Sequence, residues 1–185
     1  LGVRRQRQMC IRDSGNTDDF IFPVNHKIAK KFITHFVKHK IKNFGKYQDA
    51  IIQKEQYLFH SLLSSSMNIG LINPDDLVET IEKAKAPLNS REGFIRQLFW
   101  REYQRYCYNY FDFDNKNYFG NNKKLNKDWY DGTTGIPPID TCIKNGFNSG
   151  YLHHIERLMV VGNYMNLCDI PVSYTHLRAH ETYPH

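Results

Sequence analysis

Three ionisable side chains lie close together at the start of a strongly apolar stretch, Gly150–Leu167. They are His154, Glu156 and Arg157. Apolar residues recur in this stretch at three- and four-residue spacing and also fill its other faces, which predicts a buried helix. Burying such groups costs free energy unless each finds a partner. His154 and Arg157, three residues apart, share one helical face. That face suits an electron-rich, planar or anionic ligand; alternatively, these groups satisfy one another and nearby carbonyls.

Both ends of the chain carry the translation of one nucleotide sequence. Residues 4–14 back-translate to a stretch that contains AGATGTGTATAAGAGACAG, and residues 171–182 to one that contains its reverse complement, CTGTCTCTTATACACATCT. Inverted copies of one sequence at two ends look like translated transposon-based sequencing adapters, which are excluded from fold reasoning. We therefore expect 1–14 and 171–185 to be non-native, and 15–170 to hold a gene fragment that is cut at both ends.

Without those ends the chain is mildly basic and about the size of one domain. The whole chain holds 25 Lys and Arg against 19 Asp and Glu, and the ends hold five basic and two acidic residues. The remaining 20 against 17 are compatible with nucleic acid but do not argue for it. Cys107, Cys142 and Cys168 remain without a Cys-x-x-Cys pair, which favours a reducing, cytoplasmic compartment. No run is long enough to span a membrane.

The pattern along the chain predicts helices and no strands. Asn73 and Pro74 mark a helix start, as N-cap and first-turn residue. Turns or irregular segments are expected at 44–50, 86–89, 112–127 and 129–138, where Gly, Pro, Asn and Asp cluster. Helices are expected at 26–43, 74–84, 93–111, 140–148 and 150–167. No alternating strand pattern of any length occurs, so the predicted fold class is all-α.

Three motifs follow one another along the chain. They are Trp100-Arg101-Glu102-Tyr103, Trp129-x-x-Gly132-x-Thr134-Gly135-Ile136-Pro137-x-x-Asp140 and Gly150-Tyr151-x-His153-His154-x-x-Arg157. Together they resemble the C-terminal, flavin-binding half of the cryptochrome/photolyase family. The amino-acid sequences of the segments 44–50, 59–64 and 153–159 most resemble those of the prokaryotic six-four, iron–sulfur group of that family. The resemblance covers nearly all of 15–170, with its motifs in order.

The resemblance implies a helical bundle that holds FAD. In this family, light drives an electron from reduced flavin into a damaged pyrimidine pair that is flipped out of UV-damaged DNA. The resemblance assigns Ser61 and Ser64 to the FAD phosphates, an apt role at a helix N-terminus; a solvated turn is the alternative. It places Tyr47 at the cofactor and Arg157 against the flavin ring, where a fixed cation stabilises the anionic reduced form. It does not indicate an antenna chromophore.

The same resemblance identifies residues for the lesion pocket. Trp100 matches an aromatic wall that could stack on a flipped base, although as a core tryptophan it would be ordinary. His154 stands where six-four photolyases carry the second histidine of a pair, which is thought to supply a proton. Enzymes for cyclobutane dimers tend to have Asn there, and they carry Glu at the position of Gln97. Both differences favour the six-four lesion.

Electron supply and an iron–sulfur centre are less clearly indicated. Trp100, Trp129 and Tyr130 are candidates to pass electrons toward photoexcited flavin, with core and loop aromatics as the alternative. A 4Fe-4S cluster needs four cysteine thiolates. The resemblance would place the first about one turn before Cys142 and the others downstream of the fragment. Cys142 is therefore an offset ligand or, as we favour, a small core residue.

We therefore expect an all-α fragment of the FAD-binding domain of a monomeric DNA photolyase. The six-four lesion is the expected substrate, and this truncated chain is expected to be inactive. The alternative is a cryptochrome-like blue-light photoreceptor, which has the same flavin and no repair activity. A third interpretation is a helical domain without flavin, whose buried histidine and arginine are structural.

Overall fold

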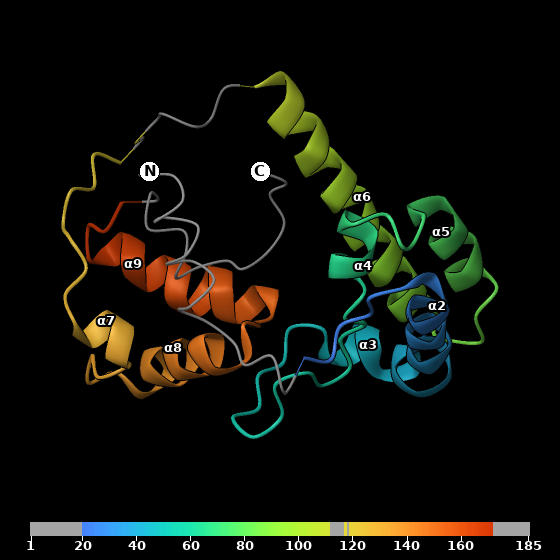
Figure 1. The fold of residues 1–185 in the computed structure, drawn as a ribbon, viewed down its shortest axis with the longest axis horizontal. Helices are drawn as coiled ribbons and strands as arrows, with labels where there is room; N and C mark the ends of the chain where they lie inside the picture. Colours follow the sequence, from blue (N-terminus) through green and yellow to red (C-terminus); the bar gives the residue numbers. More distant parts are fainter. Residues whose placement is uncertain (1–19, 112–116, 118, 172–185) are drawn as a thin grey trace. The chain divides into compact units, whose positions relative to one another are not determined.

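The computed structural model describes residues 20–111, 117 and 119–171 (Figure 1). These residues form helices joined by loops, with no strand among them, so the predicted all-α class is confirmed. They divide into two compact units. The first holds 22–50 and 57–111, and the second holds 20–21, 51–56, 117 and 119–171. No helix in the described part of the chain is both long enough and apolar enough to cross a membrane.

The first unit begins with one long helical segment, α2 (His26–His35), the π-helical turn Phe36–Lys40 and α3 (Ile41–Tyr47). The side chain of Asn25 caps α2 by accepting the Ile28 N–H at 2.9 Å. The predicted helix is present. The break expected at 44–50 is wrong in its first part, because the helix continues through Gly45 to Tyr47, and a turn follows at 48–49.

Gly45 lies inside α3, and another helix packs directly against it. Its N–H donates to Ser90 Oγ at 2.9 Å, and that hydroxyl in turn donates to the Lys42 carbonyl at 3.5 Å. Ser90 is fully buried. A Cβ added at Gly45 would lie 2.6 Å from backbone atoms of Asn89 and Ser90. The glycine therefore permits close helix contact rather than breaking the helix.

Three further helices complete the first unit: α4 (Ser64–Asn68), α5 (Pro74–Glu82) and α6 (Leu88–Tyr110). The start of α5 is as predicted, since the side chain of Asn73 accepts the Asp75 N–H at 3.2 Å. The turn predicted at 86–89 is wrong in its second half, because α6 begins at Leu88 and not at Gly93. The Pro87 carbonyl accepts from the N–H groups of Ser90 and Arg91 at 3.0 and 3.2 Å, which closes the first turn there.

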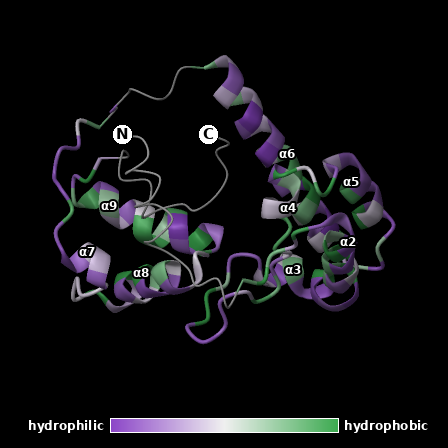
Figure 2. Cartoon of the chain, in the orientation of Figure 1, coloured by the Kyte–Doolittle hydropathy of each residue, from purple (hydrophilic) through white to green (hydrophobic). Residues whose placement is uncertain are grey.

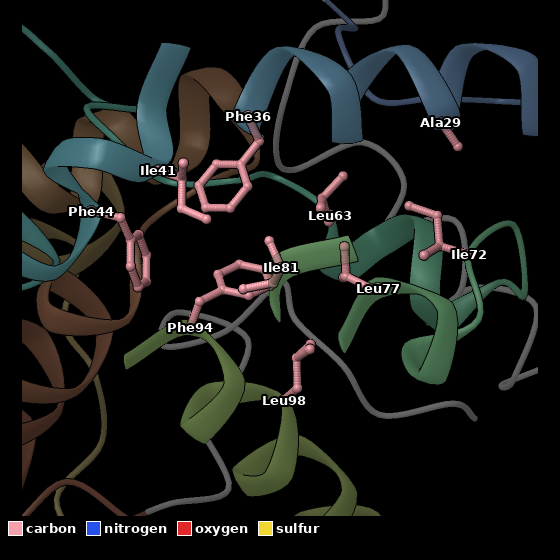
Figure 3. Close-up of a cluster of buried hydrophobic side chains, with 10 residues drawn as sticks. All are labelled: Ala29, Phe36, Ile41, Phe44, Leu63, Ile72, Leu77, Ile81, Phe94 and Leu98. Atoms are coloured by element: carbon pink, nitrogen blue, oxygen red, sulfur yellow. The ribbon is translucent and has the colours of Figure 1, made fainter. Parts of the chain in front are cut away.

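The core of the first unit brings side chains from all of its helices together (Figure 3). Three phenylalanine rings lie at its centre, Phe36, Phe44 and Phe94, with centroids 4.9 to 5.9 Å apart. Each helix carries both apolar and polar residues (Figure 2), as expected when one face is buried. The buried apolar residues are Ala29, Phe36, Ile41, Phe44, Leu63, Ile72, Leu77, Ile81, Phe94 and Leu98.

The second unit contains α7 (Asp128–Asp131), α8 (Pro137–Ser149) and a last helical segment. That segment consists of the π-helical turn Glu156–Gly162 and α9 (Asn163–Leu167). The helix predicted at 140–148 is present and longer at both ends. Two expectations need correction: the connector at 129–138 contains the single turn α7, and residues 151–153 are not helical.

The last helical segment is buried on one face only. Val161 and Met165 lie in the core of the second unit, whereas Leu158, Met159 and Leu167 are 55%, 58% and 80% exposed. The prediction of a helix buried on all sides is therefore wrong for this chain. The buried apolar residues of this unit are Trp129, Ile139, Cys142, Ile143, Leu152, Val161, Met165 and Ile170.

The contact at Gly45 predicts a selective loss of stability. Gly45→Ala should lower the free energy of unfolding by about 1–3 kcal/mol, because its Cβ meets the backbone of α6. Gly93→Ala is a matched control, since that Cβ meets only the flexible end of Gln48 at 3.3 Å. We expect it to stay within about 1 kcal/mol of the wild type. Urea unfolding followed by circular dichroism measures both. Equal effects would contradict the proposed helix contact.

Candidate functional site

The last helical segment starts with a reciprocal cap formed by two buried side chains. Nδ1 of His153 accepts the Ile155 N–H at 3.3 Å, and Oε2 of Glu156 accepts the His153 N–H at 3.2 Å. This arrangement is a capping box with histidine in place of serine or threonine. Both residues are almost fully buried, at 3% and 4% exposure. The cap therefore satisfies N–H groups that water does not reach.

Burial and neighbouring charges act on Glu156 in opposite directions. Burial raises the pKa of its carboxyl group, while the hydrogen bond from the His153 N–H and the charge of Arg157 lower it. Oε2 of Glu156 also lies 3.9 Å from Nε2 of His153. The sequence analysis missed this pair as a cap. The signal was there, since Glu stands three residues after His153, as in a capping box.

His154 and Arg157 lie on the first turn that this cap begins. Both are partly exposed, so the buried imidazole of this segment is His153 and not His154. The backbone N–H of Arg157 donates to the backbone carbonyl of His153 at 3.1 Å, and this hydrogen bond closes the first turn. The rings of the two histidines meet edge to face, with centroids 5.9 Å apart. His154 and Arg157 thus stand on the first turn of one helical segment, three residues apart, and their joint role as a ligand site stays a prediction.

A second group of predicted residues lies in the first unit, around the start of α4. Ser64 is the first residue of α4, and Ser61 precedes it in a loop where its Oγ accepts the Leu63 N–H at 3.4 Å. Two leucines of this loop, Leu58 and Leu62, adopt positive φ angles of 35° and 59°. Such strained backbone is costly, and it clusters at binding sites.

Buried hydroxyl groups in α4 fit an anionic ligand. Oγ of Ser65 and Oγ of Ser66 are shielded from solvent and have no hydrogen-bond partner in the described part of the chain. Nearby, the ammonium group of Lys40 donates to the His60 carbonyl at 3.1 Å. Partial burial lowers the pKa of Lys40. Hydroxyl donors and an amine form a donor set that suits phosphate oxygens.

Tyr47, another predicted binding residue, ends α3 and packs against Phe59 of the loop that precedes α4. Its ring stacks on Phe59, with centroids 5.5 Å apart and planes inclined by 27°. Nζ of Lys46 lies 5.0 Å from the centroid of the Tyr47 ring, at cation–π distance. The structure thus places Tyr47, Ser61 and Ser64 in one unit, on α3 and the loop that leads into α4.

Gln97 and Trp100 lie on the solvent-exposed side of α6, also in the first unit. Trp100 is 55% exposed, and its ring lies 5.6 Å from that of Tyr103. It is therefore not a core tryptophan in this chain. Its indole is accessible for stacking on a planar ligand. The backbone of α6 gives Gln97 and Trp100 the common helical side that their three-residue spacing predicts.

The other predicted electron carriers lie in the second unit and differ in burial. Trp129 is 7% exposed and stacks on Tyr164, with centroids 5.4 Å apart and planes inclined by 27°. Tyr130 is 45% exposed, and its ring lies 6.4 Å from that of Phe147. Tyr164 is an aromatic contact of Trp129 that the sequence analysis did not identify, because no local spacing links the two residues.

Sequence comparisons identify the family to which the chain belongs. Residues 94–180 match the family described as FAD binding domain of DNA photolyase. The chain is 36% identical to the (6-4) photolyase of Agrobacterium fabrum over 88% of its own length. It is 26% identical to the deoxyribodipyrimidine photo-lyase of Buchnera aphidicola over 76% of its length. The chain belongs to the cryptochrome/photolyase family.

Within this family the chain is a piece of the FAD-binding domain. It spans about a third of each of the two photolyases, 33% and 34% of their lengths. It is also 44% identical to the uncharacterized protein R853 of Acanthamoeba polyphaga mimivirus, of which it spans 85%. The family match extends past Ile170 into the segment that the nucleotide pattern assigns to an adapter. The boundaries at 14 and 171 stay predictions.

The second family motif, 129–140, forms a loop that is folded around one carboxylate. Oδ1 of Asp140 accepts from the N–H and the hydroxyl of Thr134 at 2.7 and 2.6 Å, and Oδ2 accepts the Gly135 N–H at 3.2 Å. The φ angles of Gly132 and Gly135, 64° and 82°, require glycine. Pro137 occupies the first turn of α8, where its missing N–H costs nothing.

Asp140 should make stability depend on pH. The hydroxyl of Thr134 in particular holds the pKa of Asp140 below its usual value, against an opposing effect of burial. A lowered pKa stabilises the fold above the unfolded value of about 4, and this is lost as pH falls through the folded value. Asp140→Ala should therefore be most destabilising at neutral pH, and the difference should vanish at the acidic end. Urea unfolding between pH 2 and 7 tests this, with Asp131→Ala as the exposed control.

Cys142 is the third predicted feature of this unit, and it lies in the core at 3% exposure. Burial, together with the charge of Glu156, raises the pKa of its thiol to about 12. Within the described residues, no group of three or more His, Cys, Asp or Glu side chains could hold a metal ion. The burial of Cys142 fits the favoured interpretation that it is a core residue.

The raised pKa predicts an unreactive thiol. In the folded chain at pH 8, iodoacetamide should label Cys142 more slowly than Cys107 and Cys168 by on the order of a hundredfold or more, because thiolate is scarce and access is blocked. Mass spectrometry of peptides after timed labelling measures the three rates. In denaturant the rates should become similar. Fast labelling of folded Cys142 would contradict its burial.

Proposed function

We propose that the chain is a fragment of a light-driven, FAD-dependent DNA photolyase that repairs six-four photoproducts. The observation that carries this proposal is the His153–His154 pair at a capped helix start, with Arg157 on the same turn. The identity to a protein named (6-4) photolyase over most of the chain supports it. UV-damaged DNA is the proposed partner, and a cytoplasmic monomer remains the expectation.

The residues around α4 fit the phosphates of FAD. We propose that the hydroxyls of Ser61 and Ser64 donate to the phosphate oxygens, where the shielded hydroxyls of Ser65 and Ser66 add donors without a partner of their own. Tyr47 would border the same cofactor from α3. Bound FAD supplies the light-driven electron. An iron–sulfur cluster is not part of this proposal, since the described residues offer no cysteine group for it.

The remaining roles fall to Arg157, Gln97 and Trp100, which are at least partly exposed, and to the aromatic residues Trp129 and Tyr130. Arg157 holds a fixed positive charge toward the flavin, Trp100 stacks on the flipped base, and Gln97 lies beside it on α6. Trp129 and Tyr130 are proposed to pass electrons. The stacked Trp129 is the better connected of the two. Flavin photoreduction that is unchanged in Phe variants of both residues would exclude that role.

His154 is the proposed proton donor, and its replacement gives the decisive test. In the full-length protein, His154→Asn should keep FAD binding and photoreduction and lower repair of six-four photoproducts by a factor on the order of a hundred or more, the scale of a lost general acid. Imidazole is suited to this role because it titrates near neutral pH. Flavin absorbance and photoproduct repair under blue light measure the two properties.

His153→Asn is the matched control, and its expected effect follows from the cap. The Asn side-chain oxygen can still accept the Ile155 N–H, so the helix start should form and repair should fall much less. Normal repair by both variants would remove the role of His154. A wild-type protein that binds FAD and repairs neither lesion would favour a cryptochrome-like photoreceptor, and repair of cyclobutane dimers alone would exclude the six-four assignment.

A further inference from the structure

Glu156 has no task in the proposed function, although its carboxyl group is almost completely buried. Its Oε2 accepts the His153 N–H at 3.2 Å and lies 3.9 Å from Nε2 of the same residue. Removing a carboxyl group from water is costly unless hydrogen bonds compensate. The titratable groups around it are Arg157 and His153 on its own segment, and the thiol of Cys142 on α8. A carboxyl group buried at this position therefore calls for a structural explanation.

The geometry of His153 supplies that reason. Because Nδ1 accepts the Ile155 N–H, the hydrogen of the neutral ring must be on Nε2. Nε2 is the nitrogen beside the Glu156 carboxyl group. Oε2 of Glu156 thus approaches His153 at two points: it accepts the backbone N–H, and it lies 3.9 Å from Nε2, within ion-pair range but beyond hydrogen-bond length. Both contacts lie immediately before the turn that carries His154 and Arg157.

We propose that Glu156 is a positioning residue for the histidine pair. Glu156 fixes the backbone of His153 and favours one tautomer of its ring. In this way it sets the orientation of the His154 and Arg157 side chains on the first turn. A π-helical turn begins at Glu156, and such widened turns are frequent at functional sites. The consequence for repair rests on the proposed function, whereas the positioning itself does not.

The positioning is tested on this chain without cofactor, with ¹⁵N-labelled histidine and backbone. In the wild type, the ring shifts of His153 should report the Nε2–H tautomer, and its amide should be protected from hydrogen exchange. Glu156→Ala should speed exchange of that amide by about tenfold or more and move the ring shifts toward mixed tautomers. Glu156→Gln should restore the protection, since glutamine also serves in capping boxes. Glu55→Ala, at an exposed glutamate of the same unit, should change neither.

Two results would overturn the proposal: wild-type exchange and ring shifts in Glu156→Ala, or a Gln variant that behaves like Ala. Circular dichroism identifies a variant that fails to fold. In that case, the Gln variant decides by its exchange rate and ring shifts. These ring shifts separate positioning of the ring from simple capping of the His153 N–H by Glu156, because loss of that one hydrogen bond alone would leave the bond from the Ile155 N–H to Nδ1, and hence the tautomer, unchanged.

The consequence for repair is tested in the full-length protein. Glu156→Ala should lower kcat for photorepair by about tenfold or more, with KM for damaged DNA within about twofold, and Glu156→Gln should recover most of kcat. Full kcat in the Ala variant would overturn this consequence. A wild-type protein without repair activity would instead overturn the proposed function, and the exchange and tautomer data would still decide the positioning.

Discussion

The need to satisfy buried N–H groups at one helix start organises the functional part of the second unit. The chain reaches His153 in a non-helical segment and becomes helical at the edge of the core, where His153 and Glu156 are almost fully buried and the His153 amide is shielded from water. A histidine nitrogen and a glutamate oxygen supply the missing acceptors. This solution buries a carboxyl group, which raises its pKa and ties the local fold to its protonation state. The apolar residues further along the segment complete the core, but they do not determine where the helix begins.

The same constraint explains two other buried or loop residues, Ser90 and Asp140. Ser90 joins α3 to α6 by accepting the N–H of Gly45, and Asp140 folds the loop before α8 by accepting from Thr134 and Gly135. In each case a small polar side chain satisfies backbone groups, and a glycine allows the approach or the positive φ angle. Residues of these motifs therefore shape the backbone on which the proposed ligand-binding residues stand.

Whether a hydrogen bond joins neighbouring or distant residues decides what could be predicted from the sequence. Helix starts with local signals were predictable, as at Asn73 and Pro74, because the cap and the first turn lie within a few residues. The helical state of Gly45 was not, because it depends on a neighbour 45 residues away. The exposure of Leu158 and Met159 was missed for a related reason, since hydropathy predicts which faces can be buried and not which are covered. That His154 and Arg157 stand on one helical turn was predictable from their spacing, and the assignment of burial to His154 instead of His153 was wrong.

That His153 is the buried histidine, and His154 the partly exposed one, has a chemical consequence. A histidine that caps a helix uses Nδ1 as an acceptor, so protonating that atom would break the cap. His153 is therefore poorly suited to give and take protons. His154 is one residue further along, on the first turn and partly exposed, and carries no such obligation in the capping box. Adjacent residues of one type can thus divide two tasks: the buried histidine holds the backbone, and the accessible one is available for proton transfer. This division favours His154 over His153 on structural grounds that are independent of the family resemblance.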